Sequence, residues 1–173
     1  MADPLEFLAG QVPAVKAKQG PPLERWHPPL SGDIDIRVAA DGRWYHEGGQ
    51  IKRETLVALF ASILRREEDG EYYLVTPVEK WRIQVELHPL VVTDMNREGD
   101  TLVARLNTGR EVAIDSAHAL FLEPEVGDVA GVRLAHGLSA LLTRPAWYRL
   151  VESAEERDSI LQVCSAGTWF PLQ

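Results

Sequence analysis

The stretch "YYLVTPVEKWRIQVEL", residues 72–87, contains two strand-like runs and decides how the first half of the chain folds. The join carries Thr76-Pro77 and a Glu-Lys pair instead of the Asn-Gly or Asp-Gly typical of a short hairpin. Pro77 has no N–H for a central ladder, and it drives Thr76 toward an extended backbone. The pattern predicts a kinked or bulged passage without a hairpin turn, which delivers Glu79 and Lys80 to the second strand.

Apolar and polar residues alternate along the second run. Lys80 and Arg82 share one strand face, about 7 Å apart by strand rise, and such a pair suits a phosphate or carboxylate. Solvated charges on a strand give the same pattern. If the alternation continues, Glu79 lies on the face of Trp81, where a carboxylate needs a cationic or donor partner.

The residues before this stretch predict a hairpin and a helix. Residues 33–38 alternate as a half-buried strand, Asp41-Gly42 is a turn signal, and "RWYH" is the returning strand. Two glycines then precede a helix with Lys52 and Arg53 in its first turn, a place where free N–H groups attract anions. A glycine turn with solvated charges is the alternative. The helical stripe, predicted over residues 51–64, is formed by Ile51, Thr55, Leu56, Leu59, Phe60, Ile63 and Leu64.

The second half begins with strands. Residues 90–115 read as a three-strand meander, and "HALFLEP" as a further strand. Apolar residues from Leu138 to Val151 then predict a helix, with Pro145 either opening a second segment or kinking the first. The segment "TLVALFASILRREEDGEYYLV" also resembles "RLAHGLSALLTRPAWYRLV", which indicates a duplicated motif or a chance likeness.

Composition limits the classes of function. The net charge is −8, and neither half of the chain is basic, so polymeric nucleic acid is not an expected partner. Cys164 is the single cysteine, which excludes an internal disulfide and favours the cytoplasm. The N-terminus has no basic region typical of a signal peptide, and no apolar run reaches membrane-spanning length.

The motifs that carry common chemistries are missing. The five histidines have no metal-ligand spacing, and no nucleophile elbow or glycine-rich phosphate loop occurs. A lone Cys164 in an apolar strand is usually inert. We therefore expect no metal and no cofactor, and the sequence leaves open whether the protein is an enzyme, with a non-enzyme favoured.

Residues 22–173 resemble the bacterial proteins grouped as domain of unknown function family 1285. The resemblance rests on "LVTPVEK", on the spacing of "DGRWYHEGGQIKRE", and on "DSAHALFL", "GVRLAHGLSALLTRPAWYRLVE" and "SAGTWFPL". Two points depart from the family pattern: "ELHPLVV" follows the long strand, and Cys164 stands where the family has Trp.

The resemblance implies an α+β fold with two small lobes. Each lobe is expected to hold an antiparallel sheet packed by a helix, within a duplicated strand/helix motif, and the second lobe is expected to be pleckstrin-homology-like. The expected boundaries are an N-terminal segment with a proline-rich strap over 1–30, an N-terminal lobe over 31–88 and a C-terminal lobe over 89–173.

The resemblance also implies a binding site for a small anionic, nucleotide-like ligand at the lobe junction, with a regulatory or signalling role. Two alternatives remain open: a hydrolase or transferase using Glu79 with Lys80 or Arg82, and a pleckstrin-like adaptor that binds a protein partner. Pro77 also fits the family pattern. The candidate ligand-binding residues are Trp44, Arg53, Thr76, Glu79, Lys80, Arg82, His118, Arg133 and Arg144.

Overall fold

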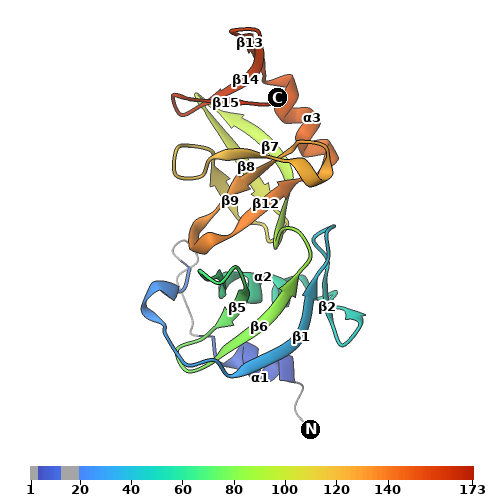
Figure 1. The fold of residues 1–173 in the computed structure, drawn as a ribbon, viewed down its shortest axis with the longest axis vertical. Coiled ribbons are helices and arrows are strands. Elements are labelled where there is room, and N and C mark those ends of the chain that lie inside the picture. Colours follow the sequence, from blue (N-terminus) through green and yellow to red (C-terminus); the bar gives the residue numbers. More distant parts are fainter. Residues whose placement is uncertain (1–3, 13–19) are drawn as a thin grey trace. The chain divides into compact units, whose positions relative to one another are not determined.

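The computed structural model describes residues 4–12 and 20–173, and it divides into two compact units. The N-terminal unit comprises Met1–Pro89 with His136–Leu138, and the C-terminal unit comprises Leu90–Ala135 with Ser139–Gln173. Of the predicted segment 1–30, residues 1–3 and 13–19 lie outside the described residues. Each unit is built around a six-stranded sheet, so the mixed α+β class is confirmed (Figure 1).

The N-terminal unit combines one sheet with two α-helices. The sheet has the order β3-β2-β1-β6-β5-β4. Its core includes the fully buried side chains of Trp44, Phe60 and Leu74. The elements are α1 (Pro4–Gly10), the 3-10 helix η1 (Leu23–Arg25), β1 (Gly32–Val38), β2 (Trp44–His46), β3 (Gly49–Gln50), α2 (Glu54–Ser62), β4 (Leu64–Arg66), β5 (Tyr72–Val75) and β6 (Lys80–Val85).

The join between β5 and β6 is a hairpin, so the prediction of a passage without a hairpin turn is wrong. The two strands pair antiparallel up to Val75 and Lys80, and the Thr76 N–H donates to the Glu79 carbonyl (2.9 Å). The Thr76 hydroxyl accepts from the N–H groups of Val78 (3.3 Å) and Glu79 (3.0 Å). A threonine side chain thus supplies the acceptor that closes this turn, as Ser and Thr do in turns that lack the Asn-Gly signal.

The predicted helix over 51–64 is shorter than its apolar stripe. Helix α2 ends at Ser62, and Leu64 begins strand β4, opposite Leu74 of β5. The Ile63 carbonyl accepts from the Val75 N–H (2.9 Å), which ties the chain to the sheet directly after the helix. Leu64 is buried whether it ends a helix or begins a strand, so the stripe could not locate the boundary.

The C-terminal unit adds a helix and a small sheet to its six strands. Its large sheet has the order β10-β11-β12-β7-β8-β9, and a three-stranded sheet follows. The elements are β7 (Leu90–Glu98), β8 (Thr101–Leu106), β9 (Glu111–Ala113), β10 (Leu120–Glu123), the 3-10 helix η2 (Pro124–Val126), β11 (Val129–Arg133), β12 (Ser139–Leu142), α3 (Arg144–Glu152), β13 (Glu155–Arg157), β14 (Ile160–Ser165) and β15 (Thr168–Pro171). The 3-10 helix η3 (Ala135–Gly137) spans the division between the units, because Ala135 belongs to this unit and His136 to the N-terminal unit.

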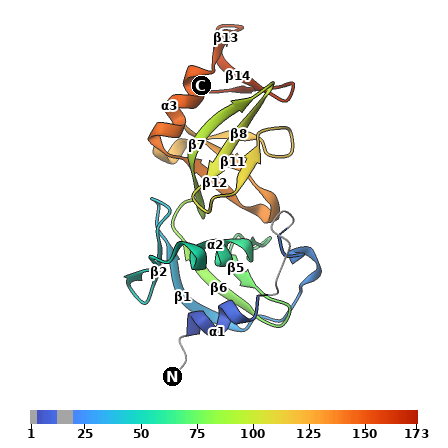
Figure 2. The same cartoon turned by 180° about the vertical axis from the view of Figure 1, so that it is seen from behind.

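The helix predicted from Leu138 to Val151 is a strand followed by a helix. Residues 139–142 form β12, and α3 begins at Arg144 with Pro145 in its first turn, the alternative in which proline opens a new segment. Helix α3 packs on β7 (Figure 2). The small sheet is joined to β8 through the buried Ser165, whose hydroxyl accepts from the Leu102 N–H (2.7 Å) and donates to the Ile114 carbonyl (2.6 Å).

Both large sheets follow one plan. In each, two antiparallel three-strand meanders join through a parallel pair formed by their first and last strands, β1 with β6 and β7 with β12. The expectation of antiparallel sheets is correct for every described strand pair of the two sheets except this one parallel pair in each. The likeness seen between the two helical segments is also not the repeat, since α2 precedes β4 whereas α3 follows β12. The duplication lies in the strand order.

Candidate functional site

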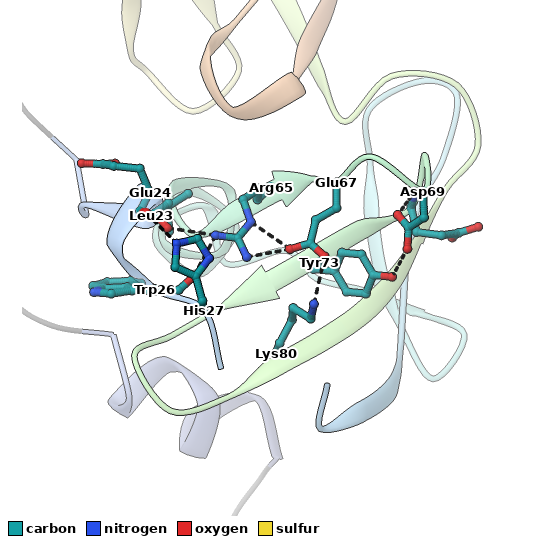
Figure 3. A network of polar contacts seen from close by, with 10 residues as sticks. Leu23, Glu24, Trp26, His27, Arg65, Glu67, Asp69, Tyr73 and Lys80 are labelled. Atoms are coloured by element: carbon teal, nitrogen blue, oxygen red, sulfur yellow. Dashed lines mark hydrogen bonds and ion pairs between the residues drawn. The ribbon is translucent and has the colours of Figure 1, made fainter. Parts of the chain in front are cut away.

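Polar side chains gather on one side of the N-terminal sheet (Figure 3). They join the sheet to the proline-rich strap, residues 20–30. Glu67 is at the centre, where its carboxylate accepts from Lys80 Nζ (2.9 Å) and Arg65 Nη2 (2.6 Å). Arg65 Nη1 also donates to the carbonyls of Leu23 and Trp26, both at 2.9 Å. These contacts attach the strap to the edge strand β4.

The electrostatics of this network hold Glu67 in its ionised form. Partial burial acts to raise the pKa of Glu67, but the hydrogen bonds and charges of Lys80 and Arg65 outweigh it and keep the pKa below its usual range. The side chains of Arg65 and Lys80 are only 12% and 18% exposed, so solvent screens these pairs less than surface pairs. Lys80 is therefore engaged by a carboxylate within the fold.

Tyr73 extends the network along the sheet. Its hydroxyl donates to Asp69 Oδ2 (2.5 Å), a bond that raises the pKa of Tyr73 to about 12 and lowers the pKa of Asp69. Lys80 Nζ lies 4.7 Å from the centre of the Tyr73 ring, within cation–π range. The ammonium group of Lys80 is thus held between a carboxylate and an aromatic face.

The other cationic candidates of this unit also have acidic partners. Arg82 donates to both oxygens of Asp33 (2.8 and 3.1 Å), a hydrogen-bonded pair that raises the pKa of Arg82. Arg53 donates to Glu6 of α1 (2.6 Å). Both pairs are at the surface, with side-chain exposures of 41% for Arg82 and 61% for Arg53.

The remaining candidates of this unit are mainly internal. Thr76 is fully buried, and its hydroxyl is used in the hairpin. Glu79 accepts a long hydrogen bond from the Trp81 indole N–H (3.4 Å), so the two side chains do lie on the same side. Trp44 is 1% exposed, and its indole N–H has no hydrogen-bond partner in the described part of the chain.

Three candidates belong to the C-terminal unit. His118 Nδ1 lies 3.4 Å from Asp115 Oδ1, and the backbone N–H of His118 lowers the pKa of Asp115 by hydrogen bonding. Arg133 stacks over the Phe121 ring at 4.8 Å. Arg144 is exposed and makes no hydrogen bond or ion pair with any residue that the structure describes. It therefore differs from the paired cations of the N-terminal unit.

Arg144 lies at a groove within the C-terminal unit. The groove encloses about 510 Å³, within the range of small-molecule sites. Its lining side chains are aliphatic or aromatic apart from Arg144, while polar atoms contribute a little under half of the accessible lining. The lining residues are Val126, Val129, Leu141, Leu142, Arg144, Trp147 and Tyr148. We refer to these seven residues as the α3 groove.

The family resemblance singled out Arg144, but Trp147 and Tyr148 were not among the candidate ligand-binding residues. Arg144, Trp147 and Tyr148 are at positions i, i+3 and i+4, so they share one face of a helix that starts at Arg144. The signal was present in "TRPAWY", but it becomes legible only when proline is taken as the start of the helix. A helix running from residue 138 places these side chains on a longer stripe instead.

Metal clusters and membrane-spanning helices are both absent from the described residues. Within residues 4–12 and 20–173, no group of three His, Cys, Asp or Glu side chains could hold a metal ion. In the same ranges, every helix is too short or too polar to cross a membrane.

Comparison with known proteins places the whole folded part in one family. Residues 21–87 match the N-terminal domain model of domain of unknown function DUF1285, and residues 89–172 match its C-terminal domain model. A crystal structure of a DUF1285 family protein from Silicibacter pomeroyi DSS-3 is 37% identical, with a TM-score of 0.88, over 100% of this chain and 96% of that one. A second, from Shewanella baltica OS155, is 32% identical with a TM-score of 0.59, over 68% of this chain and 90% of that one. No curated protein matches.

Proposed function

The chain belongs to the DUF1285 family, and we propose that it is a binding protein whose C-terminal unit takes a small anionic ligand in the α3 groove. The observation that supports this is Arg144, a cation without an acidic partner among the described residues, at the edge of a groove of about 510 Å³. A guanidinium group offers five donors in a planar fork that matches carboxylate and phosphate oxygens.

The contrast with other candidate cations supports the choice of Arg144. Lys80 and Arg82 are bonded to Glu67 and Asp33, so an incoming anion would have to displace a carboxylate from either. Arg144 has no such competitor in the described part of the chain. Binding there therefore avoids the cost of displacing a carboxylate, and the general costs of association remain: lost translational and rotational freedom, ordering and desolvation.

The family resemblance supplies the rest of the proposal. A nucleotide-like ligand and a regulatory or signalling role remain predictions. The enzyme alternative has no specific observation in its favour, because Lys80 and Arg82, its electrostatic stabilisers, are both ion-paired. The pleckstrin-like adaptor also stays a prediction.

The experiment is a thermal-shift screen of the full chain against organic anions, nucleotides and dinucleotides, followed by titration of any compound that stabilises it. A ligand that binds the folded state stabilises it by RT ln(1 + [L]/Kd), so Tm rises with the logarithm of ligand concentration once that concentration exceeds Kd. We expect Arg144→Gln to weaken binding at least about 10-fold, since an exposed charge-assisted pair is lost.

Arg149→Gln is the matched control. Arg149 lies on the same helix and is also exposed, but it donates to Asp94 Oδ1 (2.8 Å) and does not line the groove. We expect Arg149→Gln to bind like the wild type. If no compound stabilises the folded protein, or if both variants lose binding equally, the proposed function is wrong.

A further inference from the structure

The lining of the α3 groove restricts the charge of its ligand. Arg144 is the single charged residue among the seven that line it. Val126 ends η2 and Val129 begins β11, and the exposed acidic residues Glu125 and Asp128 are their neighbours in sequence. A ligand with several negative charges would find one cation among the seven lining residues, and acidic residues next to two lining valines disfavour additional negative charge. The charge pattern therefore favours a ligand with one negative charge.

The rest of the groove favours a flat apolar body. Tyr148 is 59% exposed and Val126 is 40% exposed, which are large exposures for apolar side chains that face one hollow. Trp147 and Tyr148 offer aromatic rings, and the other uncharged lining residues are aliphatic. Covering such surface stabilises a complex by about 25 cal/mol per Å² of buried apolar area, and ring stacking adds to this.

The positions on α3 set the distance between the charged group and the aromatic ring of the site. Arg144 and Tyr148 are four residues apart, so they are neighbours on one helix face, about 6 Å apart. A ligand whose charge is one or two bonds from a ring can reach both. A volume of about 510 Å³ is sufficient for one such molecule.

From these observations we propose that the ligand of the α3 groove is an aromatic monocarboxylate. Its carboxylate pairs with the Arg144 guanidinium, and its ring lies on Trp147 and Tyr148 against the aliphatic wall of Val126 and Leu142. This inference rests on the proposed function, and it replaces a nucleotide-like ligand by a smaller and less charged one.

Calorimetric titration of the full chain with phenylpropionate, phenylpropionamide, AMP and ATP tests this inference. The amide has the shape of the carboxylate without its charge. We expect phenylpropionate to bind at least about 10-fold more tightly than the amide and than ATP. Arg144→Gln is expected to remove the difference between acid and amide, because the variant can only offer a neutral donor.

A second variant tests the aromatic contact. Tyr148→Ala removes a side chain that is mostly exposed, so the fold is expected to survive. It is expected to weaken acid and amide alike, by about 3- to 10-fold for the loss of one ring contact. Arg149→Gln again serves as the control and is expected to change neither affinity.

The outcomes separate the two proposals. If AMP or ATP binds through Arg144 and phenylpropionate does not, the monocarboxylate inference is wrong while the proposed function stands. The same holds if acid and amide bind equally to the wild type. If no anion binds the folded chain, both are wrong.

Discussion

In this protein, single side chains make hydrogen bonds that backbone groups usually make. Thr76 closes the β5–β6 hairpin through its hydroxyl, and Arg65 supplies the donors for two strap carbonyls that no strand reaches. Glu67 holds two cations with one carboxylate. Each task fixes the residue type chemically, since a buried polar group costs free energy when its partner is removed.

Thr76→Val is expected to destabilise the protein by about 1–2 kcal/mol. The substitution keeps the shape of the side chain but leaves the N–H groups of Val78 and Glu79 without their acceptor in a partly buried turn. Denaturant unfolding of variant and wild type measures the difference. Thr93→Val is the control, because the Thr93 hydroxyl donates to the Arg105 carbonyl in an exposed hydrogen bond; a loss as large in the control would refute this role of Thr76.

Glu67 is expected to make stability depend on pH in the acid range. Its pKa is lower in the folded state than its ordinary value of 4.5, so the unfolded chain binds the proton more tightly. The stabilisation is therefore present above pH 4.5 and is lost as pH falls through the folded pKa. We expect the difference in denaturant midpoint between wild type and Glu67→Gln to shrink below that pH. Glu68→Gln, at an exposed neighbour, is expected to show no such change.

Among the elements, strands were predicted more accurately than helix boundaries. The β1–β2 hairpin and the β7–β8–β9 meander follow from alternation and glycine turns, both of which are local signals. The ends of α2 and α3 depend on the sheet, since Leu64 and Leu142 are buried in strands that a helical stripe also fits. For the same reason, Arg144 was the one residue of the α3 groove among the candidate ligand-binding residues predicted from the sequence.

The two parallel strand pairs could not be predicted from local sequence signals, for a different reason. β1 meets β6 and β7 meets β12 across the intervening meanders, and nothing within either strand specifies its distant partner. The ion pairs that engage Lys80 and Arg82 are likewise long-range in part: Asp33 lies 49 residues from Arg82. The sequence located these cations without showing that they were already paired.

The strap is expected to depend on Arg65 for its attachment to the sheet. Arg65→Met keeps the apolar stem but removes the donors to Leu23, Trp26 and Glu67, which we expect to cost about 2–3 kcal/mol. Hydrogen exchange of the strap amides should accelerate, in particular at Trp26, whose N–H donates to the Leu23 carbonyl (3.1 Å).

Arg66→Met is the matched control for this experiment. Arg66 is adjacent but exposed, and its hydrogen bond goes to the Gly70 carbonyl (3.2 Å) within its own turn. We expect a change below about 1 kcal/mol and no acceleration in the strap. Equal effects of the two variants would show that the strap is held by Leu23 burial alone.

The two units share one strand order but carry different sets of polar side chains. The N-terminal sheet carries Lys80 and Arg82, which are engaged by carboxylates, whereas the C-terminal unit presents Arg144, which has no acidic partner among the described residues. A shared topology thus does not imply a shared site, because the chemistry resides in side chains added to the sheet. Each unit also has its own buried core, with Phe60 in one and Leu150 in the other, both fully buried.

Because the cores are separate, a cavity in one unit is expected to loosen that unit first. Phe60→Ala should cost about 3–5 kcal/mol and Leu150→Ala about 2–5 kcal/mol. In hydrogen exchange of the full chain, Phe60→Ala should accelerate the core amides of β4, β5 and β6, and Leu150→Ala those of β7 and β12. The two variants are controls for each other, since both enlarge a fully buried site. If either one accelerates exchange equally in both sheets, the units unfold as one, and the division into two cores has no energetic meaning.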